Sequence, residues 1–190
     1  LRIPCKSEEE IFAQLGLSYI PPELREDQGE FEAAEKNQIP RLIEWTDLKG
    51  SLHNHSNWSD GQGSIEEIAK YMNELGLGYW AITDHSRAAY IASGLDAEQL
   101  KKQMKEIDDV NKKLADSGTD FRLLKGSEVD ILAEGRLDFD NDLLSKLDIV
   151  VASFHQGFSN NEAENTRRLI RAAENPFVHT LGHITGRLLL

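Results

Sequence analysis

From residue 49 onward, short apolar runs typical of buried β-strands alternate with amphipathic helices, and this alternation limits the possible folds more than any other feature. The expected strands cover residues 79–83, 121–125, 147–153 and 177–181, and the extended run after residue 125 continues from Glu128 to Leu132. The expected helices run from Ser64 to Leu75, from Asp96 to Gly118 and from Asn161 to Ala173. Strand, helix, strand repeated in this way predicts parallel strands joined by right-handed crossovers, and therefore an α/β sheet or barrel.

Residues 1–46 differ in character from the rest of the chain. Ser7 and Glu10 have the spacing of a capping box, which predicts a short helix, and two prolines at Pro21 and Pro22 fix an extended segment after it. The acidic stretch from Glu26 to Lys36 favours a second helix. We expect residues 1–46 to form a small helical leader and linker, and residues 47–190 to form the main domain.

Composition limits where the protein works and what it binds. The chain has 33 acidic and 21 basic residues and a net charge of −12, which argues against a basic surface that grips nucleic acid. A polyanionic substrate would need bound divalent cations to reverse the local charge. One cysteine, no apolar run long enough to span a bilayer and no secretory signature predict a soluble, cytoplasmic protein without a disulfide framework or membrane contact.

The stretch around His53 and His55 is the first candidate site. Side chains alternate faces along an extended strand, so these two imidazoles point the same way and can share one cation. Asp60 in the following Asp-Gly turn can bring a carboxylate back toward them. Taken alone, the pattern fits an ordinary strand with two polar residues on its outer face equally well.

The other expected strands also lead into polar residues. His85, Glu128, His155 and His183 each follow an apolar run, and in an α/β barrel the carboxyl ends of the strands share one rim. The predicted metal ligands are therefore His53, His55, Asp60, His85, Glu128, His155 and His183.

Nitrogen and oxygen donors without thiolate suit zinc, manganese or iron(II), and the clustering of the donors implies more than one ion. If Glu128 bridges two cations, such a site can clamp a phosphoryl oxygen and lower the pKa of a bound water to about 7. The predicted chemistry is hydrolysis of a phosphate ester.

Several other polar residues have less specific roles. The sixth histidine, His179, sits within an expected strand and is predicted to be structural, while Asp84 is a candidate to orient a ligand. Asp130 and Asp148 lie in or beside strands and are assigned no role. No Gly-x-Ser-x-Gly elbow and no P-loop is present.

The arginines divide into two groups. Arg167, Arg168 and Arg171 are expected on a solvated face of the last helix. Arg187 follows a glycine-containing segment at the rim and is the better candidate for a bidentate phosphate contact.

The rim motifs together resemble the PHP (polymerase and histidinol phosphatase) family. The motifs are His53-Asn-His55, Asp60-Gly61, residues 82–86 (Ile-Thr-Asp-His-Ser), residues 126–129 (Gly-Ser-Glu-Val), residues 152–155 (Ala-Ser-Phe-His) and residues 182–187 (Gly-His-Ile-Thr-Gly-Arg). The resemblance covers roughly residues 47–190, and the last motif is most similar to the PHP domain of bacterial and archaeal family X DNA polymerases. Residues 17–26 resemble the end of that polymerase's thumb region.

This resemblance implies a distorted, TIM-like seven-stranded (β/α) barrel with up to three divalent ions, most often Mn²⁺ or Zn²⁺. By the family pattern, His53, His55 and Glu128 would hold one ion, Asp60 and His85 a second, and Glu128, His155 and His183 a third. In family X polymerases the domain is linked to 3′-5′ exonuclease and DNA end processing in repair, at 3′ ends, gaps or abasic sites. The catalytic residues would be His53, His55, Glu128, His155 and Arg187.

Two departures from the family pattern affect this expectation. The pattern closes with an Asp-x-His that donates one ligand to the first ion and one to the second, and the chain stops at Leu190 without it. The polymerase palm and the helix-hairpin-helix region are also absent. We therefore expect a fragment of a longer polymerase, with an incomplete barrel, reduced metal occupancy and weak or no activity by itself.

Two alternative functions are compatible with the same residues. One is a phosphatase for small phosphate esters, as in the histidinol-phosphatase branch, against which the thumb-like leader argues. The other is a non-catalytic module that stabilises the polymerase or binds DNA, against which the retained ligand positions argue.

Overall fold

The computed structural model describes residues 4–157 and 161–184. The chain divides into two compact units, Leu1–Asp47 and Leu48–Leu190. The first unit contains α1 (Glu8–Gln14), the 3-10 turn η1 (Pro22–Leu24), α2 (Glu30–Glu35) and the 3-10 turn η2 (Trp45–Asp47). Ser7 caps α1, as its spacing from Glu10 predicts. The helix expected over the acidic stretch is shorter than predicted. Gly29 has a left-handed backbone conformation that a helix cannot contain, so α2 begins only at Glu30.

One arginine organises the first unit. Arg25 pairs with Glu8 at 2.8 Å, and its guanidinium lies over the rings of Phe12 and Tyr19 at 5.4 and 5.7 Å. Ile20 is fully buried beside these residues in the chain. A planar cation that stacks on aromatic rings lets this small unit form with few buried apolar side chains.

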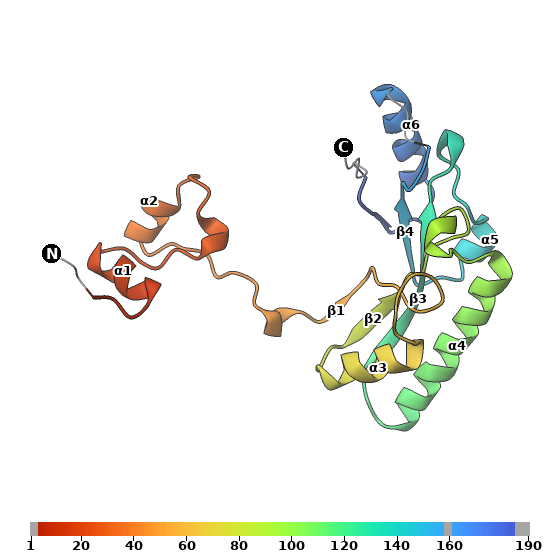
Figure 1. Cartoon of the computed structure of the whole chain (residues 1–190), viewed down its shortest axis with the longest axis horizontal. Coiled ribbons are helices and arrows are strands. Elements are labelled where there is room, and N and C mark those ends of the chain that lie inside the picture. Colours follow the sequence, from red (N-terminus) through yellow and green to blue (C-terminus); the bar gives the residue numbers. More distant parts are fainter. Residues whose placement is uncertain (1–3, 158–160, 185–190) are drawn as a thin grey trace. The chain divides into compact units, whose positions relative to one another are not determined.

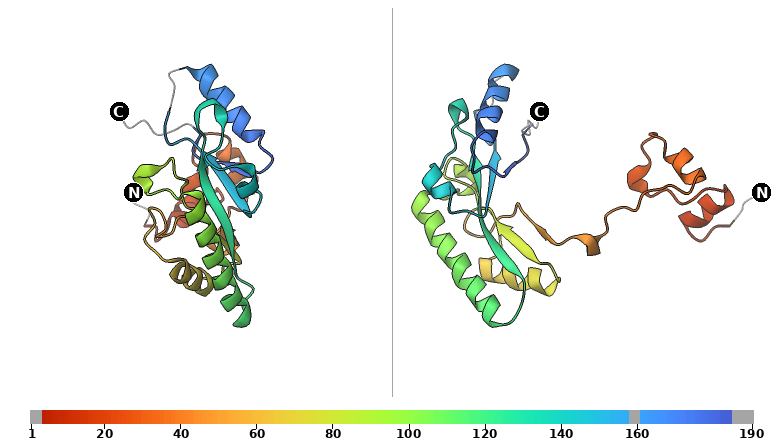
Figure 2. Two further views of the ribbon diagram at one scale, coloured as in Figure 1. Left: turned by 90° about the vertical axis from the view of Figure 1, so that its right-hand side faces the viewer. Right: turned by 180° about the vertical axis from the view of Figure 1, so that it is seen from behind.

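The second unit is a parallel sheet with helical crossovers, seen from three directions in Figures 1 and 2. Its strands are β1 (Gly50–Ser51), β2 (Tyr79–Ile82), β3 (Arg122–Asp130), β4 (Ile149–Ser153) and β5 (Thr180–Leu181). Its helices are α3 (Ile65–Glu74), α4 (Ala97–Asp116), α5 (Asn141–Leu144) and α6 (Glu162–Ala173), with 3-10 turns η3 (Tyr90–Ala92) and η4 (Ala133–Gly135). The strands pair in the order β1-β2-β3-β4-β5, all parallel.

This sequential order confirms the predicted fold class. In a (β/α) barrel each strand pairs with the next one along the chain, whereas the order reverses in a doubly wound sheet. The five strands form a curled part of a TIM-like barrel. Within the described part of the chain, no helix has the length and apolar character needed to cross a membrane.

Helix capping and packing follow the sequence pattern closely. Ser64 with Glu67 and Asp96 with Gln99 form reciprocal capping boxes at the starts of α3 and α4. The two helices cover one face of β2 and β3 (Figure 1). Their apolar stripes form one core with the sheet, which contains Ile65, Ala69, Ile82, Ile107, Val110, Phe121 and Leu123.

β3 differs from the prediction in a way that matters for the site. The sequence suggested a strand over residues 121–125 and a further extended run from Glu128 to Leu132, but β3 is one continuous strand of nine residues that contains Glu128. Its first half pairs with β2 and its second half with β4. A side chain at Gly126 would meet Ile149 and Thr83 at less than 3 Å, so glycine permits the close packing at this junction.

α6 corrects the expected placement of the arginines. Arg167 and Arg171 are exposed, as predicted, but Arg168 is buried. Its guanidinium donates to the carbonyl oxygens of Ile131, Leu132 and Gly157 and lies 4.5 Å from the ring centroid of Phe154. The three carbonyls belong to the segments that directly follow β3 and β4, so Arg168 ties these two segments together.

We expect Arg168→Ala to lower the free energy of unfolding by about 3 kcal/mol or more, because the buried guanidinium of Arg168 is the charged donor to three backbone carbonyls. Arg167→Ala, one position away on the exposed face, should change it by no more than about 0.5 kcal/mol. Thermal and urea unfolding of the two variants measures the difference. Equal stabilities would show that the guanidinium of Arg168 is not a structural tie.

Candidate metal centre

Five imidazole rings surround the carboxylate of Glu128 at the carboxyl end of the sheet. The segments after β1, β2, β4 and β5 supply the rings, and β3 supplies the carboxylate. Neighbouring ring centroids are 4.3 Å apart for His55 and His85, 4.8 Å for His85 and His155, 5.0 Å for His155 and His183, 5.4 Å for His53 and His55, and 6.4 Å for His53 and His183. These contacts close a loop, which we call the histidine ring.

The two oxygens of Glu128 face different parts of the histidine ring. Oε2 lies 3.1 Å from His53 Nε2, 3.4 Å from His55 Nε2 and 3.1 Å from His85 Nδ1. Oε1 lies 3.2 Å from His155 Nε2 and 2.9 Å from His183 Nε2. Glu128 is 1% exposed, so this carboxylate is buried and its position allows it to bridge two ions.

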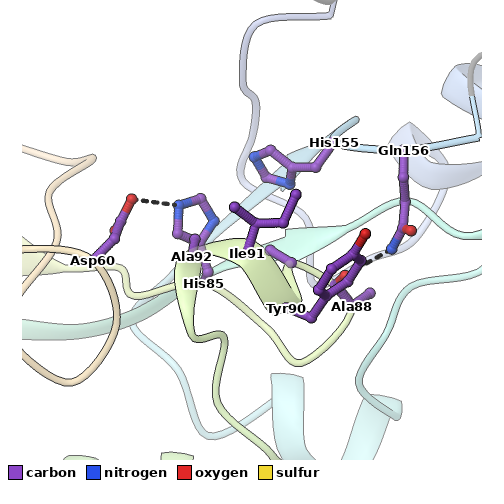
Figure 3. A pocket seen from close by; sticks show the side chains of 9 residues that line it. Asp60, His85, Ala88, Tyr90, Ile91, Ala92, His155 and Gln156 are labelled. Atoms are coloured by element: carbon purple, nitrogen blue, oxygen red, sulfur yellow. Dashed lines mark hydrogen bonds and ion pairs between the residues drawn. The ribbon is translucent and has the colours of Figure 1, made fainter.

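Asp60 approaches the histidine ring from outside. One carboxylate oxygen is 3.6 Å from His55 Nδ1, and the other is 3.6 Å from His85 Nε2, the contact drawn in Figure 3. Three sets of donor atoms lie within 4.8 Å of one another: His53, His55 and Glu128; His55, Asp60 and His85; and His85, Glu128 and His155. The structure thus gathers all seven residues that the sequence suggested as metal ligands.

Local backbone contacts explain why these side chains converge. The segment after β2 continues beside β3, where Ser86 N–H donates to the carbonyl of Glu128 at 2.9 Å, and this places His85 next to Glu128. His53 and His55 are in irregular chain beyond the short β1 rather than in the expected strand. Asn54 holds this chain, because its N–H donates to Thr83 Oγ1 at 2.8 Å and its carbonyl accepts from Thr83 N–H at 2.7 Å.

Asp84 acts on the turn between His55 and Asp60 rather than directly on a histidine. Its carboxylate accepts from the backbone N–H and hydroxyl of Ser56 at 2.8 and 2.6 Å, from the hydroxyl of Ser59, and from the amide of Gln103 at 2.6 Å. The turn that carries Asp60 is therefore anchored to a buried carboxylate.

Asp130, which had no role in the sequence analysis, orients His155. It is 1% exposed, and its Oδ2 accepts from Nδ1 of His155 at 3.1 Å. This contact leaves Nε2 of His155 facing Glu128, which is the arrangement by which a carboxylate commonly fixes a metal-binding imidazole. Side chains two residues apart in a strand lie on the same face, so Asp130 faces the centre as Glu128 does. This spacing could have identified Asp130 from the sequence.

Two residues of the sequence analysis lie elsewhere. His179 is apart from the histidine ring, and its Nδ1 accepts from the backbone N–H of Val150 at 3.1 Å, which is a structural role. Arg187, the candidate phosphate contact, lies outside the described residues.

The pKa values reflect the balance of burial and charge at the centre. Burial favours the neutral acid of Glu128, but its interactions with the rings of His155 and His53 outweigh burial and hold its pKa well below the usual range. Burial alone would lower the pKa of His155, but the hydrogen bond and negative charge of Asp130, with the charge of Glu128, raise it to about 9. Burial lowers the pKa of His85.

Several ring nitrogens at the centre lack a hydrogen-bond partner among the described residues, which suits the binding of a divalent cation. Nδ1 of His55, Nδ1 of His85 and Nε2 of His155 are buried and make no aligned hydrogen bond, although each lies 3.1–3.6 Å from a carboxylate oxygen. Buried polar atoms normally have partners, and a cation placed between ring nitrogens and carboxylates would provide them.

Comparison with known proteins agrees with this geometry. Residues 51–188 match the PHP domain family, and residues 2–26 match the DNA polymerase beta thumb. The chain is 46% identical over 183 residues to the DNA polymerase/3′-5′ exonuclease PolX of Bacillus subtilis, which covers 96% of the chain and 31% of that protein. It is 38% identical over 65 residues to a probable phosphatase of Syntrophotalea carbinolica, which covers 33% of the chain and 27% of that protein.

A putative histidinol phosphatase from Listeria monocytogenes superposes with a TM-score of 0.46 at 22% identity, over 56% of the chain and 45% of that structure. The chain spans about a third or less of the length of the two curated relatives.

We expect the pKa of His155 in the metal-free protein to be about 9, and Asp130→Asn to bring it down toward the ordinary histidine value of about 6.5. The change removes the negative charge that favours the imidazolium. A proton-detected NMR titration of the histidine side chains in the presence of a chelator measures this pKa. Asp142→Asn on the exposed surface of α5 is the matched control and should leave the titration of His155 unchanged.

A titration of His155 with the same midpoint in the wild type and in Asp130→Asn would contradict this account of the pair. Because a metal ion must displace the proton on a ligating imidazole, metal affinity should also rise between pH 6 and pH 9 in the wild type.

Proposed function

We propose that the histidine ring of this chain, which belongs to the PHP domain family and carries part of a DNA polymerase thumb, hydrolyses phosphodiester bonds at DNA 3′ ends with two or three divalent ions. The observation that carries the proposal is the buried carboxylate of Glu128 with five imidazoles around it. Several nitrogen and oxygen donors that share one carboxylate are typical of sites that hold neighbouring metal ions.

The proposed ligand sets are those that the resemblance to the PHP family implies, and the distances between donor atoms support them. His53, His55 and Glu128 would hold one ion, Asp60 with His85 a second, and Glu128 with His155 and His183 a third, with His55 and His85 at the boundaries between them. Mn²⁺ or Zn²⁺ suits these donors. When bound, such ions neutralise phosphoryl oxygens and lower the pKa of a coordinated water.

The protein side chains supply orientation and charge. Glu128 keeps its negative charge at the centre, Asp130 fixes which nitrogen of His155 faces the centre, and Asp84 fixes the turn that carries Asp60. A cavity adjoins the histidine ring and is lined in part by Asp60, His85 and His155. No lysine or arginine is found among the described residues that line it. The positive charge that attracts a phosphodiester would therefore come from the bound ions, together with Arg187 as a proposed phosphate contact.

The proposed setting is DNA end processing within a family X polymerase. The thumb match and the relative named DNA polymerase/3′-5′ exonuclease PolX support DNA as the substrate, with 3′ ends, gaps or abasic sites as the places of action. The remaining polymerase domains would bind the duplex. A net charge of −12 agrees with a chain that depends on ions and on other domains for its hold on DNA.

A phosphatase acting on small phosphate esters is the second candidate. The similarity to a probable phosphatase over 65 residues favours it, since a related histidine ring would serve monoesters as well. The leader of residues 2–26 supports the DNA substrate instead, because it matches the thumb of a DNA polymerase.

We expect the full-length protein with Mn²⁺ to shorten 5′-labelled DNA from its 3′ end, and His155→Ala to lower the rate by about a hundredfold or more, because His155 contacts the shared carboxylate. Gel analysis of product length over time measures the rate. His179→Asn is the matched control: it changes a histidine outside the histidine ring and should retain most of the activity.

Equal rates from the wild type and His155→Ala would remove the catalytic assignment. Release of inorganic phosphate from small monoesters without any shortening of DNA would favour the phosphatase instead.

A further inference from the structure

A cavity of about 430 Å³ adjoins the histidine ring, with ionisable side chains on one side and a largely apolar segment on the other (Figure 3). Asp60, His85 and His155 line it on the side of the metal centre. The segment of residues 88–92 and Gln156 line the rest. A volume of this size is within the range of small-ligand sites. The cavity therefore suits a ligand with an anionic group at one end and a flat or apolar group at the other.

The apolar wall exposes two large side chains. Tyr90 is 74% exposed and Ile91 is 87% exposed, and they are adjacent in the 3-10 turn η3. Contiguous apolar surface with polar residues at its rim is a feature of ligand-binding grooves. An aromatic and a branched aliphatic side chain next to each other offer a surface on which a flat ring can stack.

Although its side chains are exposed, the backbone of this segment is held in place. The N–H of Ala88 donates to Asp138 Oδ2 at 2.7 Å, and the amide of Gln156 donates to the carbonyl of Ala88 at 2.7 Å (Figure 3). At Gly94 a side chain would come within 1.8 Å of the carbonyl oxygen of Ser86, so glycine lets the segment return to the strand end. A surface that is fixed in advance loses little entropy when it binds a ligand.

We propose that Tyr90 and Ile91 form a platform for the base of the 3′-terminal nucleotide, which places the scissile phosphodiester beside the histidine ring. This inference deepens the proposed function and depends on it. A nucleotide pairs a flat base with an anionic phosphate, as the two walls of the cavity require. Stacking is available to all four bases, so the platform would accept any sequence.

The charge of the protein also favours this occupant. With a net charge of −12 and no lysine or arginine among the described residues lining the cavity, affinity for a single DNA end cannot come from backbone phosphates at this wall. Contact with the base would add affinity to that supplied by the bound ions and the other polymerase domains. Gln156 adds no base contact in this arrangement, because its amide is bonded to Ala88.

The test compares two DNA ends in the full-length protein with Mn²⁺. One 5′-labelled strand ends in a natural nucleotide, and the other ends in a tetrahydrofuran nucleotide that has the same phosphodiester but no base. We expect Tyr90→Ala to lower kcat/KM roughly tenfold on the natural end, as loss of one stacked base predicts. On the base-free end the variant should equal the wild type, and Tyr90→Phe should behave as the wild type on both.

Tyr71→Ala is the matched control, because Tyr71 is an exposed tyrosine of α3 that does not line the cavity. It should leave both rates unchanged. An equal loss on both ends, or no loss on either, would overturn the platform while leaving the nuclease function in place. A loss with p-nitrophenyl phosphate but not with DNA would assign the wall to a small aromatic ester and overturn the proposal. No cleavage of either end by the wild type would overturn the platform and the proposed function together.

Discussion

The rest of the domain depends on the interaction between the carboxylate of Glu128 and the imidazoles around it. A buried charge is costly unless it is paired, and here five imidazoles from four different segments converge on it. Because each segment follows a strand of the same parallel sheet, the sequential strand order is what brings the five imidazoles to this charge. The contacts between Glu128 and the imidazoles therefore form the site and also hold the carboxyl ends of the strands together.

A second layer of residues holds this arrangement. Asp84 anchors the turn before Asp60, Asp130 orients His155, and Arg168 ties the loops that follow β3 and β4. All three are charged and almost fully buried, and each satisfies backbone groups or side chains that would otherwise lack partners. Their cost in solvation is offset by the precision with which donor atoms are placed, which a metal-dependent site requires.

The sequence predicted what depends on local pattern. The parallel strands follow from the alternation of strands and helices, while the barrel order came from the family resemblance. Ser64, Asp96 and the polar residues after each strand were visible because caps and strand ends have sequence signals. It did not reveal what depends on tertiary contacts. Arg168 has the spacing of a surface residue but is buried by the loops that pass over it, and β3 is longer than its composition suggests because its two halves pair with different strands. The exposure of Tyr90 and Ile91 also depends on the loop in which they lie.

The central claim is that the ring around Glu128 is a centre for several metal ions. Crystals grown with Mn²⁺, with diffraction recorded at the manganese absorption edge, test it most directly. The account predicts anomalous peaks on both sides of the Glu128 carboxylate, one among His53, His55 and Oε2 and another between Oε1 and His155. A map without a peak in contact with Glu128, at full Mn²⁺ and neutral pH, would contradict it.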